Sequence, residues 1–225
     1  MTETTLQPVG PELPRVKPRL RGVSHQYAFF AALVAGAVLV ALAPGSTARL
    51  VTAIYALSLC AMFGTSALYH RLHWPPRQRR WMRRLDHSMI FVLVAGTYTP
   101  FAALVLSSTL GTVVLAVVWG GALAGVVITL VWTDAPRWFT AAIYISLGWV
   151  SIVALPQLYD RAGAAAVALL LGGGLLYTAG AVVYARKRPD PIPAVFGYHE
   201  IFHMLVIAAA AAHYLAVALY AVPNG

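Results

Sequence analysis

Charged residues are scarce in this sequence: Asp, Glu, Lys and Arg make up 10% of the 225 residues, while 60% of the residues are hydrophobic. Soluble domains carry about 25% charged residues, and a short chain cannot bury so much apolar surface in its own core. The composition therefore excludes an ordinary soluble protein and predicts one that is embedded in a membrane.

Cysteine and acidic residues are also rare. The lone cysteine, Cys60, excludes an intramolecular disulfide, and its place in an apolar run predicts a packing residue. Seven acidic residues are outnumbered by 16 basic ones, which gives a net charge of +9. Because the basic residues lie between apolar runs rather than on one soluble face, they indicate membrane orientation and not the binding of nucleic acid.

The first 24 residues lack an apolar run altogether. They are polar and rich in proline, which predicts neither a signal peptide nor a folded domain. We expect residues 1–24 to form a flexible cytoplasmic tail and residues 25–225 to form the membrane domain.

Seven apolar stretches are long enough to cross a bilayer, which takes about 20 residues in a helix. Breaks rich in Pro, Gly, Asp or Arg separate them, and the weakest break is SSTLG because it has no charge. The sequence therefore predicts an all-α membrane protein, a seven-transmembrane helix bundle. The predicted spans are 26–43, 50–70, 86–107, 110–132, 138–158, 162–184 and 199–221.

The basic residues predict the orientation of the bundle. When successive loops are assigned to alternate sides, all of the 16 Lys and Arg residues except Arg49 and Arg161 fall on one side. The positive-inside rule places that side in the cytoplasm, so the N-terminus is predicted to be cytoplasmic and the C-terminus outside. The arginines between the second and third spans are also compatible with binding of anionic lipid headgroups.

The few ionisable residues inside the spans converge at one depth. His70 ends the second span, Asp86 begins the third, and His199 and His203 begin the seventh, so all four are predicted at cytoplasmic ends. Such residues are costly in a membrane and are usually functional. Their convergence predicts a polar site shared by three helices.

These residues have the chemistry of a metal site. His199 and His203, spaced i and i+4, lie on one helix face, and His70 would complete the three-ligand pattern of catalytic zinc. Ser66, one turn before His70, could orient that histidine or a bound water. Asp86 could act as a general base toward the water. A polar funnel without metal stays open as the alternative.

The remaining histidines have simpler explanations. His25, His73 and His87 lie near helix ends, where an interfacial residue is more common than a ligand. His213 lies in the middle of a span and is expected to hydrogen-bond to another helix. Glycines in the fourth and sixth spans permit close helix packing, either within the chain or in a homo-oligomer.

Three segments, SALYH, LDHSMIFVLVAGTYTPF and GYHEIFHMLVIAAAAAHY, resemble the signature regions of the hemolysin III family. This family is the bacterial branch of the PAQR membrane proteins, which also include the adiponectin receptors. The resemblance implies a seven-helix bundle in the bacterial cell membrane with an intracellular N-terminus. It also implies a zinc ion held by the motif histidines, with the motif serine and aspartate nearby. By position these residues are His70, His199, His203, Ser66 and Asp86.

The letters HEIFH also spell the H-E-x-x-H motif of zinc metalloproteases. On a helix, Glu200 lies about 100° from His199 and thus on a neighbouring face. The resemblance makes Glu200 an occupant of that face rather than the base. We therefore interpret the protease motif as coincidental.

The resemblance favours two functions. Alkaline ceramidases share a comparable Ser, His and Asp constellation, which favours a zinc-dependent hydrolase of a lipid amide or ester, with membrane lipid as substrate. The alternative is a receptor or regulator of membrane lipid state, with structural zinc and lipid as ligand. Direct cytolysis is least favoured, because the sequence has no amphipathic pore-forming hairpin and no secretion signal.

Overall fold

The computed structural model describes residues 17–132 and 135–224. Within these ranges the chain is helical and contains no β-strand, as the hydropathy pattern predicts. Most of the expected tail, residues 1–16, lies outside the described residues. The main helices are α1 (Val23–Leu42), α2 (Gly45–Arg71), α3 (Pro76–Leu104), α4 (Ser108–Val131), α5 (Arg137–Gly148), α6 (Leu155–Arg186) and α7 (Tyr198–Ala216), with short turns η1 (Trp149–Ala154), η2 (Val217–Ala221) and η3 (Val222–Asn224).

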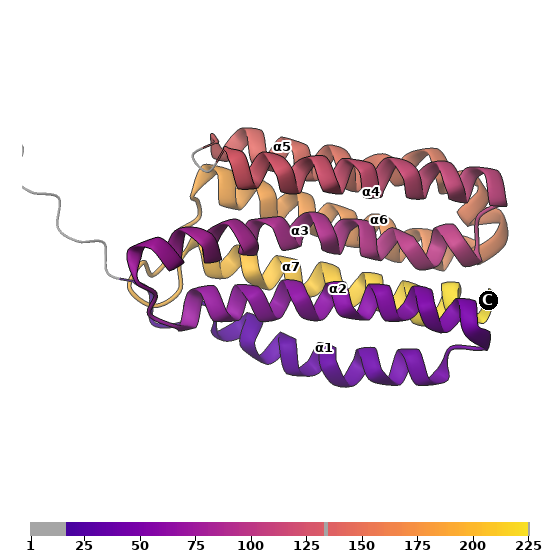
Figure 1. The fold of residues 1–225 in the computed structure, drawn as a ribbon, viewed down its shortest axis with the longest axis horizontal. Helices are drawn as coiled ribbons and strands as arrows, with labels where there is room; N and C mark the ends of the chain where they lie inside the picture. Colours follow the sequence, from indigo (N-terminus) through magenta and orange to yellow (C-terminus); the bar gives the residue numbers. More distant parts are fainter. Residues whose placement is uncertain (1–16, 133–134, 225) are drawn as a thin grey trace, which may run out of the picture.

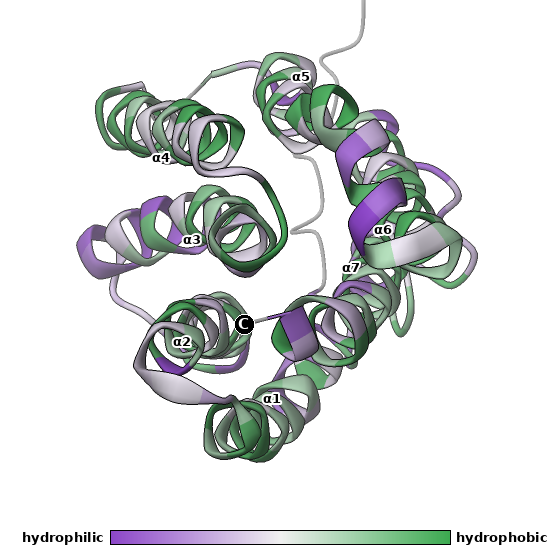
Figure 2. Ribbon diagram, turned by 90° about the vertical axis from the view of Figure 1, so that its right-hand side faces the viewer, coloured by the Kyte–Doolittle hydropathy of each residue, from purple (hydrophilic) through white to green (hydrophobic). Residues whose placement is uncertain are grey.

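Helices that follow one another in sequence lie side by side and close into a ring, because α7 packs against both α6 and α1 (Figure 2). Large apolar side chains cover the outer surface; Val34, Leu57 and Leu123 are 69%, 69% and 67% exposed. Such a surface is costly in water but is solvated by lipid. Cys60 packs against the buried core, as expected.

All the helix ends that were predicted to be cytoplasmic lie at the same end of the bundle (Figure 1). The two basic residues predicted for the other side bind carbonyl oxygens there. Arg49 Nε donates to the Ala43 carbonyl (3.1 Å), and Arg161 Nη1 donates to the Val105 carbonyl (2.9 Å). The positive-inside rule therefore assigns the end that carries the start of α1 to the cytoplasm.

Two helices extend beyond their predicted spans. α2 begins at Gly45 rather than at residue 50, and α3 begins at Pro76 rather than at residue 86. The arginine-rich stretch before Asp86 is therefore helical and not a loop. Proline is well suited to the first turn of a helix, and a helix can continue past the membrane into water. Hydropathy marks only the part of a helix that lies in lipid.

The helical stretch Arg137–Arg186 is 50 residues long and contains two crossings. A straight helix of that length would measure about 75 Å, against a hydrocarbon core of about 30 Å. Gly163 interrupts it with φ 84° and ψ 170°, and the chain folds back there. The evidence for the reversal is a hydrogen bond from Trp149 Nε1 to Thr178 Oγ1 (3.0 Å), because these two residues lie nearly equally far before and after Gly163 in the sequence. The predicted break YDRAG is thus confirmed, and the described chain crosses the membrane seven times.

Gly163→Ala is expected to destabilise the protein by about 1–3 kcal/mol, because its backbone conformation is one that essentially only glycine adopts. The melting temperature of the purified protein measures the effect. Gly172→Ala is the matched control: Gly172 lies within α6, and an added Cβ would meet nothing within 4 Å. The control should be neutral or slightly stabilising. Equal melting temperatures for the two variants would contradict the prediction.

Candidate metal centre

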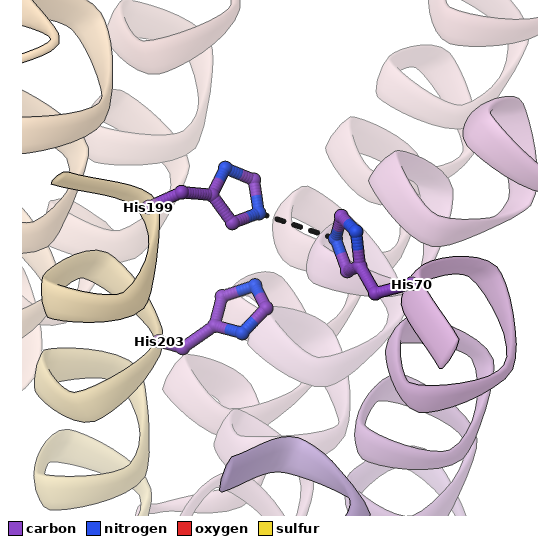
Figure 3. Close-up of side chains that lie close together, drawn as sticks. All are labelled: His70, His199 and His203. Atoms are coloured by element: carbon purple, nitrogen blue, oxygen red, sulfur yellow. Dashed lines mark hydrogen bonds between the residues drawn. The ribbon is translucent and has the colours of Figure 1, made fainter. Parts of the chain in front are cut away.

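Three histidines from two helices meet at the cytoplasmic end of the bundle (Figure 3). His70 lies in the last turn of α2, His199 and His203 lie one turn apart at the start of α7, and all three are buried. Their ligand nitrogens lie within 4.8 Å of one another, and His70 Nε2 is 3.1 Å from His199 Nε2. Imidazole nitrogens bound to one zinc ion lie about 3.4 Å apart, given bonds of about 2.0–2.1 Å. The three side chains therefore fit a single metal ion.

Backbone features at two helix starts place these histidines. Gly22 precedes α1 with φ 79°, and a Cβ at this position would lie 2.5 Å from the His70 Cβ. Glycine therefore lets the start of α1 approach α2 closely. At the start of α7, the Gly197 amide donates to Glu200 Oε2 (2.8 Å), which fixes the first turn that carries His199.

A carboxylate lies beside the histidines. Asp86 Oδ2, on α3, is 3.7 Å from His70 Nε2. Asp86 also lines the same cavity as Ser66, His199 and His203. The structure thus places Asp86 with the three histidines, at the point where the sequence predicts the site.

Ser66 reaches the histidines through another residue. Its Oγ hydrogen-bonds to His25 Nδ1 (2.8 Å), and the His25 ring stacks on the His203 ring, with centroids 3.7 Å apart and planes inclined by 8°. The sequence suggested an interfacial position for His25, but the structure buries it to 2% exposure. Its place depends on how α1 is rotated against α7, which no sequence motif encodes. Ser66 therefore supports His203, by way of His25.

The other histidines lie outside the three-histidine group. His213 Nε2 is 3.1 Å from the Leu170 carbonyl oxygen, so it bonds α7 to α6 as predicted. His73 is exposed in the turn between α2 and α3. His87 lines the cavity beside the site, with its Nε2 3.5 Å from the Tyr184 hydroxyl.

Glu200, the acidic residue of the H-E-x-x-H letters, has structural partners. It is 2% exposed, its Oε1 forms an ion pair with Arg21 Nε (2.6 Å), and its Oε2 caps α7. The amides of Arg19 and Leu20 donate to two carbonyls of the loop between α6 and α7, so the end of the expected tail is fixed there. Because both carboxylate oxygens of Glu200 have structural partners, neither is available to act as a catalytic base. The geometry therefore supports the interpretation that the H-E-x-x-H letters are coincidental.

A largely apolar cavity of about 150 Å³ lies beside the histidines. His203 and Asp86 line its cytoplasmic part, and Trp149 and His213 line its part within the middle of the bundle. A second cavity of about 60 Å³ also touches Trp149 and His213. Because the two cavities share Trp149 and His213 in their linings, the space beside the metal centre adjoins further space within the bundle.

The fold and the site define a class of protein: a multi-pass membrane protein whose described helices enclose a three-histidine centre able to hold a metal ion near one membrane face. The family described as haemolysin-III related matches residues 14–214. The chain belongs to this family.

Individual relatives agree with this assignment. Hemolysin-3 of Bacillus cereus is 32% identical over 175 residues, which cover 76% of this chain and 75% of the relative. The heptahelical transmembrane protein ADIPOR2 of Oryza sativa subsp. japonica is 30% identical over 149 residues, 60% of this chain and 65% of that protein. Human monocyte to macrophage differentiation factor is 25% identical over 201 residues, 88% of this chain and 81% of that protein. The resemblance seen in the sequence is therefore confirmed.

Proposed function

We propose that this protein is a zinc-dependent hydrolase that cleaves an amide or ester bond of a lipid at the cytoplasmic face of a bacterial cell membrane. The observation that carries the proposal is the juxtaposition of three buried histidines, the Asp86 carboxylate and an apolar cavity. Catalytic zinc is typically held by three protein ligands, with the fourth position open to water or substrate.

The residues divide the chemistry between them. When bound, zinc would polarise the carbonyl of the substrate and lower the pKa of a bound water to about 7. Asp86, whose Oδ2 lies 3.7 Å from His70 Nε2, would act as the general base that takes a proton from the attacking water and returns it to the departing amine or alcohol. Ser66 keeps the His203 ring oriented through the His25 stack. The apolar cavity holds the acyl chain.

A second candidate is a receptor or regulator of membrane lipid state in which the metal is structural. The observation that favours it is that the histidines come from α2 and α7, so an ion would tie together two helices far apart in the sequence. This function needs no proton acceptor. The role of Asp86 therefore distinguishes the two candidates.

The test is hydrolysis by zinc-loaded protein purified in a neutral detergent. Ceramides, N-acyl ethanolamines, phosphatidylcholine, monoacylglycerols and lysophosphatidic acid cover the amide and ester classes with uncharged, zwitterionic and anionic heads, and mass spectrometry measures the released fatty acid. We expect release from at least one class, loss of release on chelation and recovery when zinc is returned. A folded, zinc-replete protein that releases no fatty acid from any of them would overturn the enzymatic proposal and favour the receptor.

A further inference from the structure

Basic side chains gather in the lining of the cytoplasmic part of the cavity. Among its described lining residues, Arg83, Arg84 and Arg137 are the basic ones, and Asp86 is the one carboxylate. The rest of the lining is mostly apolar or aromatic. A cavity with this lining is suited to an amphiphile that has an apolar chain and a negatively charged head.

Arg137 is held by two aromatic side chains that contact the metal centre. Its Nη1 donates to the Tyr198 hydroxyl (3.1 Å), and its guanidinium lies over the Tyr184 ring, 5.0 Å from the centroid. Both tyrosine rings contact the His199 ring, at 6.1 Å and 5.8 Å between centroids. No carboxylate of the described residues forms an ion pair with Arg137. The guanidinium is therefore linked to His199 through two tyrosine rings, and it has no anionic partner among the described residues.

The position of Arg137 is not explained by helix stability. It is the first residue of α5, where the positive end of the helix dipole disfavours a cation. It is also not explained by membrane orientation alone, because exposed arginines such as Arg77 and Arg80 on α3 supply that charge without entering the cavity. A half-buried arginine that lines the cavity calls for a ligand.

Arg83 acts at the same place from another helix. Arg83 and Arg137 line the same cavity as His87 and Tyr184. α3 and α5 thus each bring a guanidinium group to the wall of this cavity. Guanidinium groups bind phosphate and carboxylate through short, charge-assisted and often bidentate hydrogen bonds.

We propose that Arg137, together with Arg83, forms a subsite for the phosphate or carboxylate headgroup of an amphiphile whose apolar chain lies in the cavity. The inference rests on the proposed function, since it makes the lipid substrate an anionic one with its head beside the metal centre. Binding itself requires no hydrolysis. An added charged hydrogen bond of this kind strengthens binding by about tenfold to a hundredfold.

The test compares two ligands that differ only in the headgroup. An ether-linked alkyl glycerol phosphate and the corresponding alkyl glycerol have the same chain, and neither contains a carboxylic ester or an amide bond. Native mass spectrometry of the full, zinc-loaded protein in a neutral detergent measures the bound fraction of each. We expect the phosphate to bind at least about tenfold more tightly. Equal binding of the two ligands would overturn the subsite.

Variants assign the preference to residues. Arg137→Gln keeps a polar side chain of similar length and should lose most of the preference for phosphate. Arg80→Gln removes an equal charge from the same membrane face, outside the cavity, and should keep it. If Arg137→Gln does not fold, Arg137→Lys is the second variant; it keeps the charge, loses the bidentate donors and should lose part of the preference. If a folded Arg137 variant kept the full preference for the phosphate ligand, the assignment of the headgroup subsite to Arg137 would be overturned.

Free anions provide the last comparison. Inorganic phosphate and glycerol phosphate should displace the alkyl glycerol phosphate only weakly, because they lack the apolar chain. If the free anions displaced the alkyl glycerol phosphate at concentrations similar to that of the ligand itself, the proposal of an amphiphile site would be overturned. The site would then be one for a free anion. Because these measurements involve no turnover, their failure counts against the subsite, whereas a lack of fatty acid release counts against the hydrolase.

Discussion

His203→Ala and His70→Ala are both expected to abolish metal binding, although the two residues lie on different helices. Loss of a residue that only supports a metal ligand weakens binding by about 10–100-fold, so loss of one of three ligands should weaken it at least about 100-fold. Metal content is measured by mass spectrometry on detergent-purified protein after zinc replenishment. We expect a single zinc ion per chain in the wild type and almost none in either variant.

His213→Ala is the matched control for this experiment. His213 is a half-buried histidine of α7 that bonds to the Leu170 carbonyl, outside the three-histidine group. Its variant should keep the zinc. A folded wild type that takes up no metal would reduce the histidines to a polar cluster. Equal loss of zinc in the His213 variant would show that the effect is one of folding and not of ligation.

Metal removal should also lower stability. A ligand that binds only the folded state stabilises it by about 4 kcal/mol when its free concentration is about 1,000 times the dissociation constant. Chelation should therefore lower the melting temperature of the wild type more than that of His203→Ala.

Asp86→Asn is expected to lower lipid hydrolysis by about 10²–10⁴-fold, the usual contribution of a general base, while zinc content stays unchanged. The amide keeps the size of the side chain but cannot accept the proton of the attacking water. Asp86 lies 3.7 Å from His70 and is not one of the three grouped ligands, so metal binding should survive. The measurement is fatty acid release per zinc-loaded protein.

Glu200→Gln separates this mechanism from that of an H-E-x-x-H protease. Breaking the buried pair with Arg21 should destabilise the protein by about 3–5 kcal/mol, but hydrolysis per folded, zinc-loaded molecule should be preserved. Full turnover in Asp86→Asn, or a loss in Glu200→Gln as large as that expected for Asp86→Asn, would show that the base has been assigned to the wrong residue.

The membrane class of the fold could be predicted from the sequence because hydropathy is a local property. A run of about 20 apolar residues crosses the bilayer whatever its neighbours are. The same local signals predicted the reversal near Gly163 and the orientation from the basic loops. They could not show that α3 begins at Pro76, because a helix that projects into water has no hydropathy signal.

The three histidines could also be predicted from the sequence. His199 and His203 share a helix face by their i, i+4 spacing, and the ends of the spans place His70 at the same depth. Spacing and depth could be predicted because the membrane fixes the height of each helix. That α2 and α7 bring His70 and His199 into contact was decided by the packing of the bundle.

Only the tertiary structure decided which side chains meet across helices. The stack of His25 on His203 depends on the rotation of α1 about its own axis, and the Arg21–Glu200 ion pair depends on where the chain before α1 lies on the loop between α6 and α7. The approach of Arg137 to the metal centre depends on the packing of α5. Hydropathy and depth are set by each segment's own composition, whereas rotation and lateral contact are set by the packing of side chains from segments far apart in the sequence.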